Sequence, residues 1–112
     1  MKKDEVTFAD FMKLDLRIGK VLEAEEVAGS INLIRLKVDL GKDYGVKKSI
    51  SGIAKWYKPK DLKGKKFVFL TNLAPKQMMK EMSNGMILCV MIDEEARLTP
   101  VEKDIPEGSI VR

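Results

Sequence analysis

The chain contains no histidine, and Cys89 is the only cysteine among its 112 residues. Without histidine, Ser-His-Asp and Cys-His catalysis are excluded, and a single cysteine forms no internal disulfide. The usual zinc sites need several Cys or His ligands, and neither a Walker loop nor a GxGxxG motif occurs. We therefore expect no catalytic site, no metal and no cofactor. Cys89 lies in an apolar run, which favours a small buried side chain over a reactive thiol.

Long apolar runs are missing as well. No stretch approaches the ~20 apolar residues of a membrane-spanning helix, and the N-terminal sequence MKKDEVTFADF has acids where a signal peptide is apolar. The composition, 45 % hydrophobic and 34 % charged, is that of a globular protein. We expect a single domain over residues 1–112 that acts in the cytoplasm and has no membrane partner.

Positive charge is concentrated in the middle of the chain. The formal net charge is +4, yet residues 46–66 contain eight lysines and only one acid, Asp61. Such a segment attracts phosphate backbones and steers a polyanion to the surface. The alternative is a lysine-rich face that is merely solvated, and charge alone does not separate the two interpretations.

Alternation of apolar and polar residues predicts a series of strands. The main ones cover residues 14–22, 34–40, 47–53, 67–70 and 86–92. Gly19 indicates a bulge or sharp bend in the first strand, and the apolar residues 86–92 predict a strand buried on both faces. We also expect a short strand over residues 98–101 and a helical turn with Thr7 as its N-cap and Asp10 three residues on.

Five curved strands with a helical connection between the third and the fourth follow the order of an OB-fold. Residues 54–57 predict a short helix, and Pro59 either ends it or begins another over residues 60–62. An open sandwich is the alternative, but the bend at Gly19 favours the barrel. We predict an all-β fold with small helical additions: an N-terminal helical turn over residues 1–13, a five-stranded OB barrel over 14–92, and a C-terminal extension over 93–112. The extension is expected to pack on the barrel or to form a dimer contact.

Six short motifs follow one another along nearly the whole chain. They are LDLRIGKV (residues 14–21), LKVDLG (36–41), ISGI (50–53), YKPKDLKGK (57–65), NLAPK (72–76) and SNGM (83–86). In this order they resemble the structure-specific tRNA-binding domain family. Its members are appended to the C-terminus of many methionyl-tRNA synthetases or stand alone as dimers. The resemblance implies a non-catalytic tRNA-binding protein, beta-subunit-like, that forms a homodimer and has an aminoacyl-tRNA synthetase as a further possible partner.

The resemblance also implies which residues touch tRNA. The family uses a basic residue before the Ser-Gly turn, the Asn and the basic residue of the Asn-Leu-x-Pro motif, and the Ser and Met of the Ser-x-Gly-Met motif. These fall on Lys47, Asn72, Lys76, Ser83 and Met86. Lys48 follows Lys47, and Asn32 stands where typical members have a lysine in the first loop. Lysines 47, 48, 63, 65 and 66 are expected to attract the tRNA backbone.

Several of these residues have a structural alternative. Asn72 and Ser83 suit turn chemistry, and Met86 suits the core, while Trp56 and Tyr57 are more typical of core or interface than of stacking platforms. The methionines between residues 78 and 82 exceed what a short loop can bury, so we expect them to flank a ligand or a second subunit. A peptide-binding, chaperone-like protein of the same fold that uses this methionine-lined groove is the alternative function.

Overall fold

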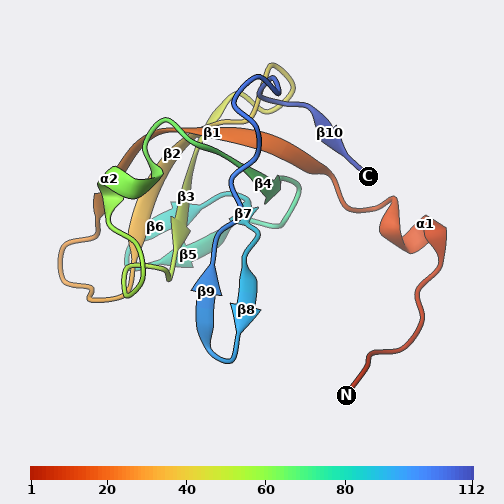
Figure 1. Cartoon of the computed structure of the whole chain (residues 1–112), viewed down its shortest axis with the longest axis horizontal. Helices are drawn as coiled ribbons and strands as arrows, with labels where there is room; N and C mark the ends of the chain where they lie inside the picture. The colour runs from red at the N-terminus through yellow and green to blue at the C-terminus, as the bar shows by residue number, and fades with distance from the viewer.

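Five antiparallel strands form a curved sheet that nearly closes into a barrel in the computed structural model, which describes residues 1–112 (Figure 1). The strands are β1 (Leu16–Glu26), β2 (Ile34–Asp39), β3 (Val46–Ser51), β4 (Lys66–Leu70) and β7 (Met86–Ile87), in the spatial order β3-β2-β1-β4-β7. The predicted all-β, five-stranded OB-type barrel is therefore confirmed. No helix is long and apolar enough to span a bilayer.

The long strand β1 joins the two halves of the barrel. Its first half pairs with β4 and its second half with β2, and the register to β2 shifts between Val21 and Glu23. A bulge is thus present, two residues after the predicted position. Gly19 has a different role: a Cβ built there would lie 2.7 Å from Phe69 Cδ1 and 2.7 Å from Val38 Cγ1. Glycine allows these two side chains to pack across β1.

The core fills the barrel mainly with inward-facing side chains, which occupy alternate positions along the strands. It consists of Val21, Ile34, Leu36, Val38, Leu40, Ile53, Leu62, Phe67, Phe69, Ile87 and Ala96. Leu62 comes from the one-turn helix α2 (Pro59–Leu62), which connects β3 to β4 as predicted and begins at proline. Residues 54–56 form a turn instead of the helix expected over 54–57, because the residue before Pro59 is held in an extended conformation.

The last gap of the barrel, between β3 and β7, is closed by three hydrogen bonds. The Ile50 N–H donates to Ser83 Oγ at 2.9 Å, the Asn84 N–H to the Lys48 carbonyl at 2.8 Å, and Ser49 Oγ to the Gly85 carbonyl at 3.2 Å. Two of the three use a serine hydroxyl, so side chains replace a regular strand ladder here.

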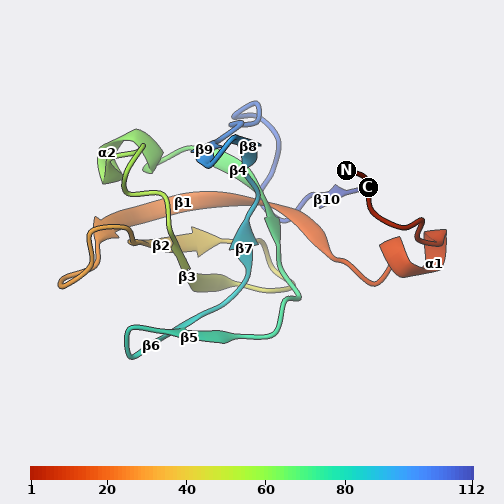
Figure 2. The ribbon, with the colours of Figure 1, turned by 90° about the horizontal axis from the view of Figure 1, so that it is seen from below.

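The expected loop between β4 and the last barrel strand contains a hairpin. It consists of β5 (Lys76–Met78) and β6 (Glu81–Ser83) and lies on the opposite side of the β1–β2–β3 sheet from α2 (Figure 2). Both turn residues are left-handed, with φ of 46° at Met79 and 69° at Lys80. This is the geometry of a tight type I′ turn, built here without glycine or asparagine.

The prediction of one doubly buried strand over residues 86–92 is wrong. Strand β7 ends at Ile87, the Leu88 N–H still donates to the Val68 carbonyl of β4 at 3.0 Å, and the chain then leaves β4 and forms a separate hairpin, β8 (Val90–Ile92) with β9 (Glu95–Arg97). Only Ile87 is buried, whereas Val90, Met91 and Ile92 are 49, 58 and 51 % exposed. Residues 98–101 form no strand: β9 ends at Arg97, and Pro100 has no N–H to donate to a strand ladder.

The C-terminal extension packs on the barrel. Strand β10 (Ile110–Val111) pairs with Leu16 and Arg17 of β1, beyond the point where β2 ends. Lys66 donates from Nζ to the carbonyls of Lys103 and Ile105, both at 2.7 Å, and lies 2.9 Å from Glu107. Lys66 is only 9 % exposed. The expectation that Lys66 attracts phosphate is therefore wrong, because its ammonium group is enclosed by this segment.

The N-terminal segment stands apart from the barrel at the end where the C-terminus also lies (Figures 1 and 2). It contains the one-turn helix α1 (Phe8–Phe11). The predicted capping box is confirmed: the Asp10 N–H donates to Thr7 Oγ1, and the Thr7 N–H donates to the Asp10 carboxylate.

Candidate nucleic-acid interface

A groove runs between the turn after β3, the start of the β5–β6 hairpin and the start of β7. We call it the hairpin groove. It has a volume of about 200 Å³ and is lined by Ile50, Ser51, Gly52, Leu73, Ala74, Lys76, Met78, Ser83, Gly85 and Met86. Three of the predicted site residues, Lys76, Ser83 and Met86, come together here.

These three residues differ in what they offer a ligand. Ser83 is 6 % exposed, and its hydroxyl accepts the Ile50 N–H, so it fixes the wall of the hairpin groove. Met86 is 45 % exposed and supplies a flexible apolar surface. Lys76 is exposed and takes part in no ion pair of the structure. The groove therefore combines an apolar surface with one free cation.

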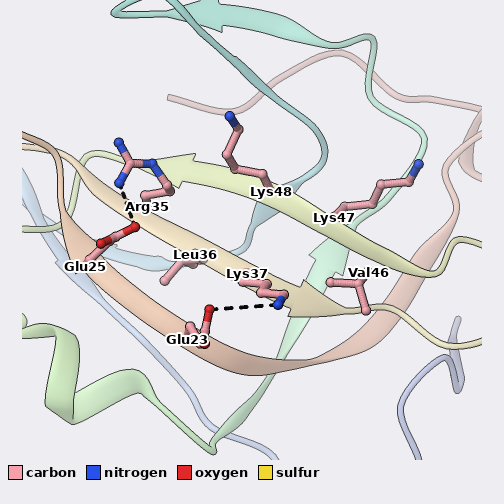
Figure 3. A pocket seen from close by; sticks show the side chains of 8 residues that line it. All are labelled: Glu23, Glu25, Arg35, Leu36, Lys37, Val46, Lys47 and Lys48. Carbon is pink, nitrogen blue, oxygen red and sulfur yellow. Dashed lines mark hydrogen bonds and ion pairs between the residues drawn. The ribbon is translucent and has the colours of Figure 1, made fainter.

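A second groove crosses the outer face of β1, β2 and β3 (Figure 3). We call it the sheet groove. Its volume is about 440 Å³, and it is lined by Glu23, Glu25, Arg35, Leu36, Lys37, Val46, Lys47 and Lys48. Most of its cations are paired: Lys37 lies 3.9 Å from Glu23, and Lys48 lies 3.1 Å from Glu81. Lys47 is exposed and has no carboxylate partner.

The carboxylate of Glu81 connects the hairpin to this sheet. Arg35 donates to it twice, from Nε at 2.7 Å and from Nη2 at 2.5 Å, and Nη1 donates to Glu25 at 2.8 Å. The hydrogen bonds from Arg35, and then from Lys48, lower the pKa of Glu81 to about 2. The same contact with Glu81 raises the pKa of Arg35. The pair is therefore ionised at any neutral or mildly acidic pH.

Asn72 lies outside both grooves. Its Oδ1 accepts the Asp15 N–H at 2.8 Å, and its Nδ2 donates to the Lys13 carbonyl at 2.7 Å. It lines a separate hollow formed with residues 11–15 and 110–112. Both polar atoms of the side chain are thus used to hold the segment before β1.

Asn32 lies in the exposed β1–β2 loop. Its backbone is fixed, because its carbonyl accepts the Ala54 N–H at 3.0 Å and its N–H donates to Ser30 Oγ at 3.2 Å. Its side-chain amide makes no hydrogen bond within the protein. The predicted site residues thus fall into three groups: those of the hairpin groove, the two lysines of the sheet groove, and two asparagines outside both.

Groups with catalytic or metal-binding potential are sparse. No group of three or more His, Cys, Asp or Glu side chains is placed to hold a metal ion. Cys89 is half-buried, and burial raises the pKa of its thiol, as expected for a packed side chain. Sequence reasoning did not identify Arg35 or Glu81 as parts of the site, whereas Met78, which lines the hairpin groove, is one of the methionines expected to flank a ligand or a second subunit. Arg35 and Glu81 are 46 positions apart, so no local pattern reveals their contact.

Comparison with known proteins agrees with this geometry. A family model described as a putative tRNA binding domain matches residues 16–110. The methionine–tRNA ligase of Clostridium acetobutylicum is 47 % identical in an alignment of 112 positions that covers 98 % of this chain and 17 % of that ligase. The chain thus spans about 17 % of the length of this curated relative.

Two solved structures are similar over their whole length. A MetRS related protein from Pyrococcus horikoshii has a TM-score of 0.92 and 32 % identity, covering 98 % of this chain and 100 % of that one. The chaperone CsaA from Bacillus anthracis has a TM-score of 0.85 and 34 % identity, covering 97 % and 100 %. The chain belongs to the putative tRNA binding domain family and is related to the C-terminal tRNA-binding domain of methionyl-tRNA synthetases.

Proposed function

We propose that the chain binds tRNA through the hairpin groove and Lys47, and that it catalyses no reaction itself. One observation carries the proposal. Lys47 on β3 and Lys76 on β5 flank β6 on its two sides, and neither is neutralised by a carboxylate. Free cations beside an apolar groove suit RNA, whose phosphates need positive charge and whose unstacked bases need apolar surface. Membership of the family supports this proposal.

In this mechanism each group has a distinct task. Lys47 and Lys76 neutralise backbone phosphates, while Met86 and Met78 lie against the face of a base. Ser83 holds the groove in shape through Ile50. Lys63 and Lys65 follow α2 on the far side of the sheet from the hairpin, so they add only long-range attraction.

Salt dependence tests the proposal. Two or three neutralised phosphates give a slope of log K against log salt of about −2. Lys47→Ala and Lys76→Ala should each weaken binding of total tRNA and make the slope shallower by about 0.7 to 0.9. Lys60→Ala is the matched control, because Lys60 is exposed on α2 across the sheet.

The unaltered protein should bind at low salt, and Lys60→Ala should bind almost as well. Absence of binding at low salt contradicts the proposal. Equal losses in all three lysine variants would show that only net charge matters, and this also contradicts it.

We further propose that the protein is a cytoplasmic homodimer and that a synthetase is a partner. Large apolar side chains are exposed at the end of the molecule that carries both termini: Val6, Phe8, Met12, Leu14 and Ile110. Clustered exposed apolar groups of this kind are typical of interaction sites. The relationship to a ligand that contains the same domain supports a synthetase partner. Sedimentation equilibrium should give a dimer mass, and Phe8→Asp should give a monomer.

A second candidate function is the binding of unfolded peptides. An apolar groove of about 410 Å³ lies beside the hairpin groove and is lined by Ser51, Gly52, Ile53, Trp56, Met86, Ile87, Leu88, Cys89, Met91 and Ala96. The similarity to a chaperone favours this candidate. If it is correct, a fluorescent apolar peptide binds with equal affinity to the unaltered protein and to Lys47→Ala and Lys76→Ala, while Met91→Asp lowers the affinity.

A further inference from the structure

The β5–β6 hairpin is attached to the barrel at three levels. Its base is held by Ser83 and Asn84, which bond to β3. The end next to its turn is held by Glu81, through Arg35 and Lys48. Its tip reaches the β1–β2 loop, where a Cβ added to Gly29 would lie 3.6 Å from Met79 Cε. The hairpin therefore spans from the edge strand β3 to the loop that follows β1.

The hairpin needs these attachments. It has only three cross-strand pairs, and an isolated two-stranded hairpin is at best marginally stable in water. The turn lowers the stability of the hairpin further, since Met79 and Lys80 both adopt the left-handed conformation that L-residues disfavour. The contact with Arg35 is the strongest attachment by geometry, because a guanidinium fork meets a carboxylate with two bonds.

One cross-strand pair of the hairpin takes part both in the contact with Arg35 and in the hairpin groove. Met78 lies opposite Glu81, and Lys76 lies opposite Ser83. Side chains of directly opposed residues emerge on the same face of a hairpin. The face that Arg35 fixes through Glu81 is therefore the face that carries Lys76 and Met78 into the hairpin groove.

Arg35 is poorly suited to bind phosphate itself. Three of its nitrogens already donate to the carboxylates of Glu25 and Glu81, so its charge is matched inside the protein. We propose that Arg35 is a positioning residue for tRNA binding: it fixes the β5–β6 hairpin through Glu81 and so sets the place of Lys76 and Met78. This inference rests on the proposed function.

A matched pair of variants distinguishes the positioning of the hairpin by Arg35 from the effect of its positive charge on tRNA binding. Arg35→Gln and Lys37→Gln each remove one positive charge from the outer face of β2, but Lys37 pairs only with Glu23 on β1. Trypsin cleavage after Lys80, without RNA, reports release of the hairpin. We expect Arg35→Gln to accelerate this cleavage about tenfold or more and Lys37→Gln to leave it unchanged. Thermal melts check that both variants are folded.

Binding of tRNA is then measured in a double-mutant cycle with Lys76→Ala. Arg35→Gln should weaken binding about tenfold in the normal background, since a released hairpin must be reordered. It should have little further effect when Lys76 is already alanine. Lys37→Gln should add its small effect in both backgrounds. Arg35→Lys, which keeps the charge but loses the fork, should behave like Arg35→Gln.

Three outcomes contradict the inference. They are unchanged cleavage after Lys80 in Arg35→Gln, effects of Arg35→Gln and Lys76→Ala that add fully, and normal tRNA binding by Arg35→Lys. Absence of tRNA binding by the unaltered protein is a different result, because it contradicts the proposed function while the cleavage experiment still reports whether Arg35 holds the hairpin.

Discussion

The side chain of Asn72 holds the backbone of Asp15, with the Asp15 N–H donating to Asn72 Oδ1 at 2.8 Å across 57 positions of sequence. The neighbouring Thr71 adds to this contact, because its hydroxyl and its N–H both donate to the Asp15 carbonyl, at 2.6 and 2.9 Å. The residues after β4 thus fix the point where the N-terminal segment enters β1.

Asn72→Ala should release this segment. Two hydrogen bonds are lost, one to Asp15 and one to Lys13, and we expect the free energy of unfolding to fall by about 1–2 kcal/mol. Proteolysis before residue 15 should become faster. Urea denaturation measures the change in the free energy of unfolding. Asn32→Ala is the control: the exposed side-chain amide of Asn32 has no partner, so its loss should lower the free energy of unfolding by less than about 0.5 kcal/mol. Equal costs for the two variants would contradict the assigned role.

Lys66→Met should detach the C-terminal extension. The variant keeps the length of the side chain but leaves the carbonyls of Lys103 and Ile105, and the Glu107 carboxylate, without their donor. We expect a loss of about 2–4 kcal/mol in the free energy of unfolding. Lys65→Met is the control, because Lys65 is exposed and makes no ion pair. A thermal melt of Lys66→Met that matches the control would refute this prediction.

Gly19→Ala should destabilise the barrel by steric overlap alone. The added methyl group would lie 2.7 Å from Phe69 Cδ1 and 2.7 Å from Val38 Cγ1, so core side chains must move. Overpacking of this kind costs about 1–3 kcal/mol. Gly52→Ala is the matched control, since no atom lies within 4 Å of its added Cβ. Chemical denaturation that ranks the two variants the other way would show that the close packing is misassigned.

Stability should fall in acid because of two ionised carboxylates. Arg35, followed by Lys48, lowers the pKa of Glu81 from 4.5 to about 2, and the hydrogen bond from Arg17 lowers that of Asp15. A carboxylate whose folded-state pKa is depressed stabilises the fold above its unfolded pKa and ceases to do so as pH falls. The contribution of Glu81 is therefore present above pH 4.5 and lost progressively towards pH 2.

Melting temperatures measured from pH 7 to pH 2 test this. Glu81→Gln should show a shallower decline between pH 4.5 and 2 than the unaltered protein, because the titrating group is gone. Glu94→Gln should leave the decline as it is, since Glu94 is exposed and makes no ion pair. An unchanged profile for Glu81→Gln would exclude Glu81 as a source of the acid sensitivity.

Local patterns predicted much of the barrel. The alternation in β2 and the apolar residues of β4 placed both strands within one residue, and Pro59 marked the start of α2. These signals are local, because one buried face imposes a period of two on a strand and proline is compatible with the first turn of a helix.

Other features depend on contacts that no local pattern encodes. Residues 86–92 are equally apolar before and after the point where the chain leaves β4, so their composition did not reveal that the chain departs from β4 after Leu88. Lys66 belongs to a lysine-rich run, and only its contact with Glu107 and two carbonyls distinguishes it from its exposed neighbours. The hairpin depends on Arg35 and Glu81, which meet only after folding. The motifs named the candidate site residues. The structure places Lys76, Ser83 and Met86 in one groove, whereas Asn72 lies in a different hollow.

The pairing of β10 with the start of β1 has a kinetic consequence. Leu16 pairs with Leu70 on one side and with Val111 on the other, so the first strand is completed by residues synthesised 95 positions later. Closing such long loops is slow, and domains rich in distant strand pairs fold in about milliseconds to seconds. During synthesis, the edge of β1 at Leu16 and Arg17 stays unpaired until residues 110–111 have emerged from the ribosome. Closure of that edge is therefore expected among the final steps of folding.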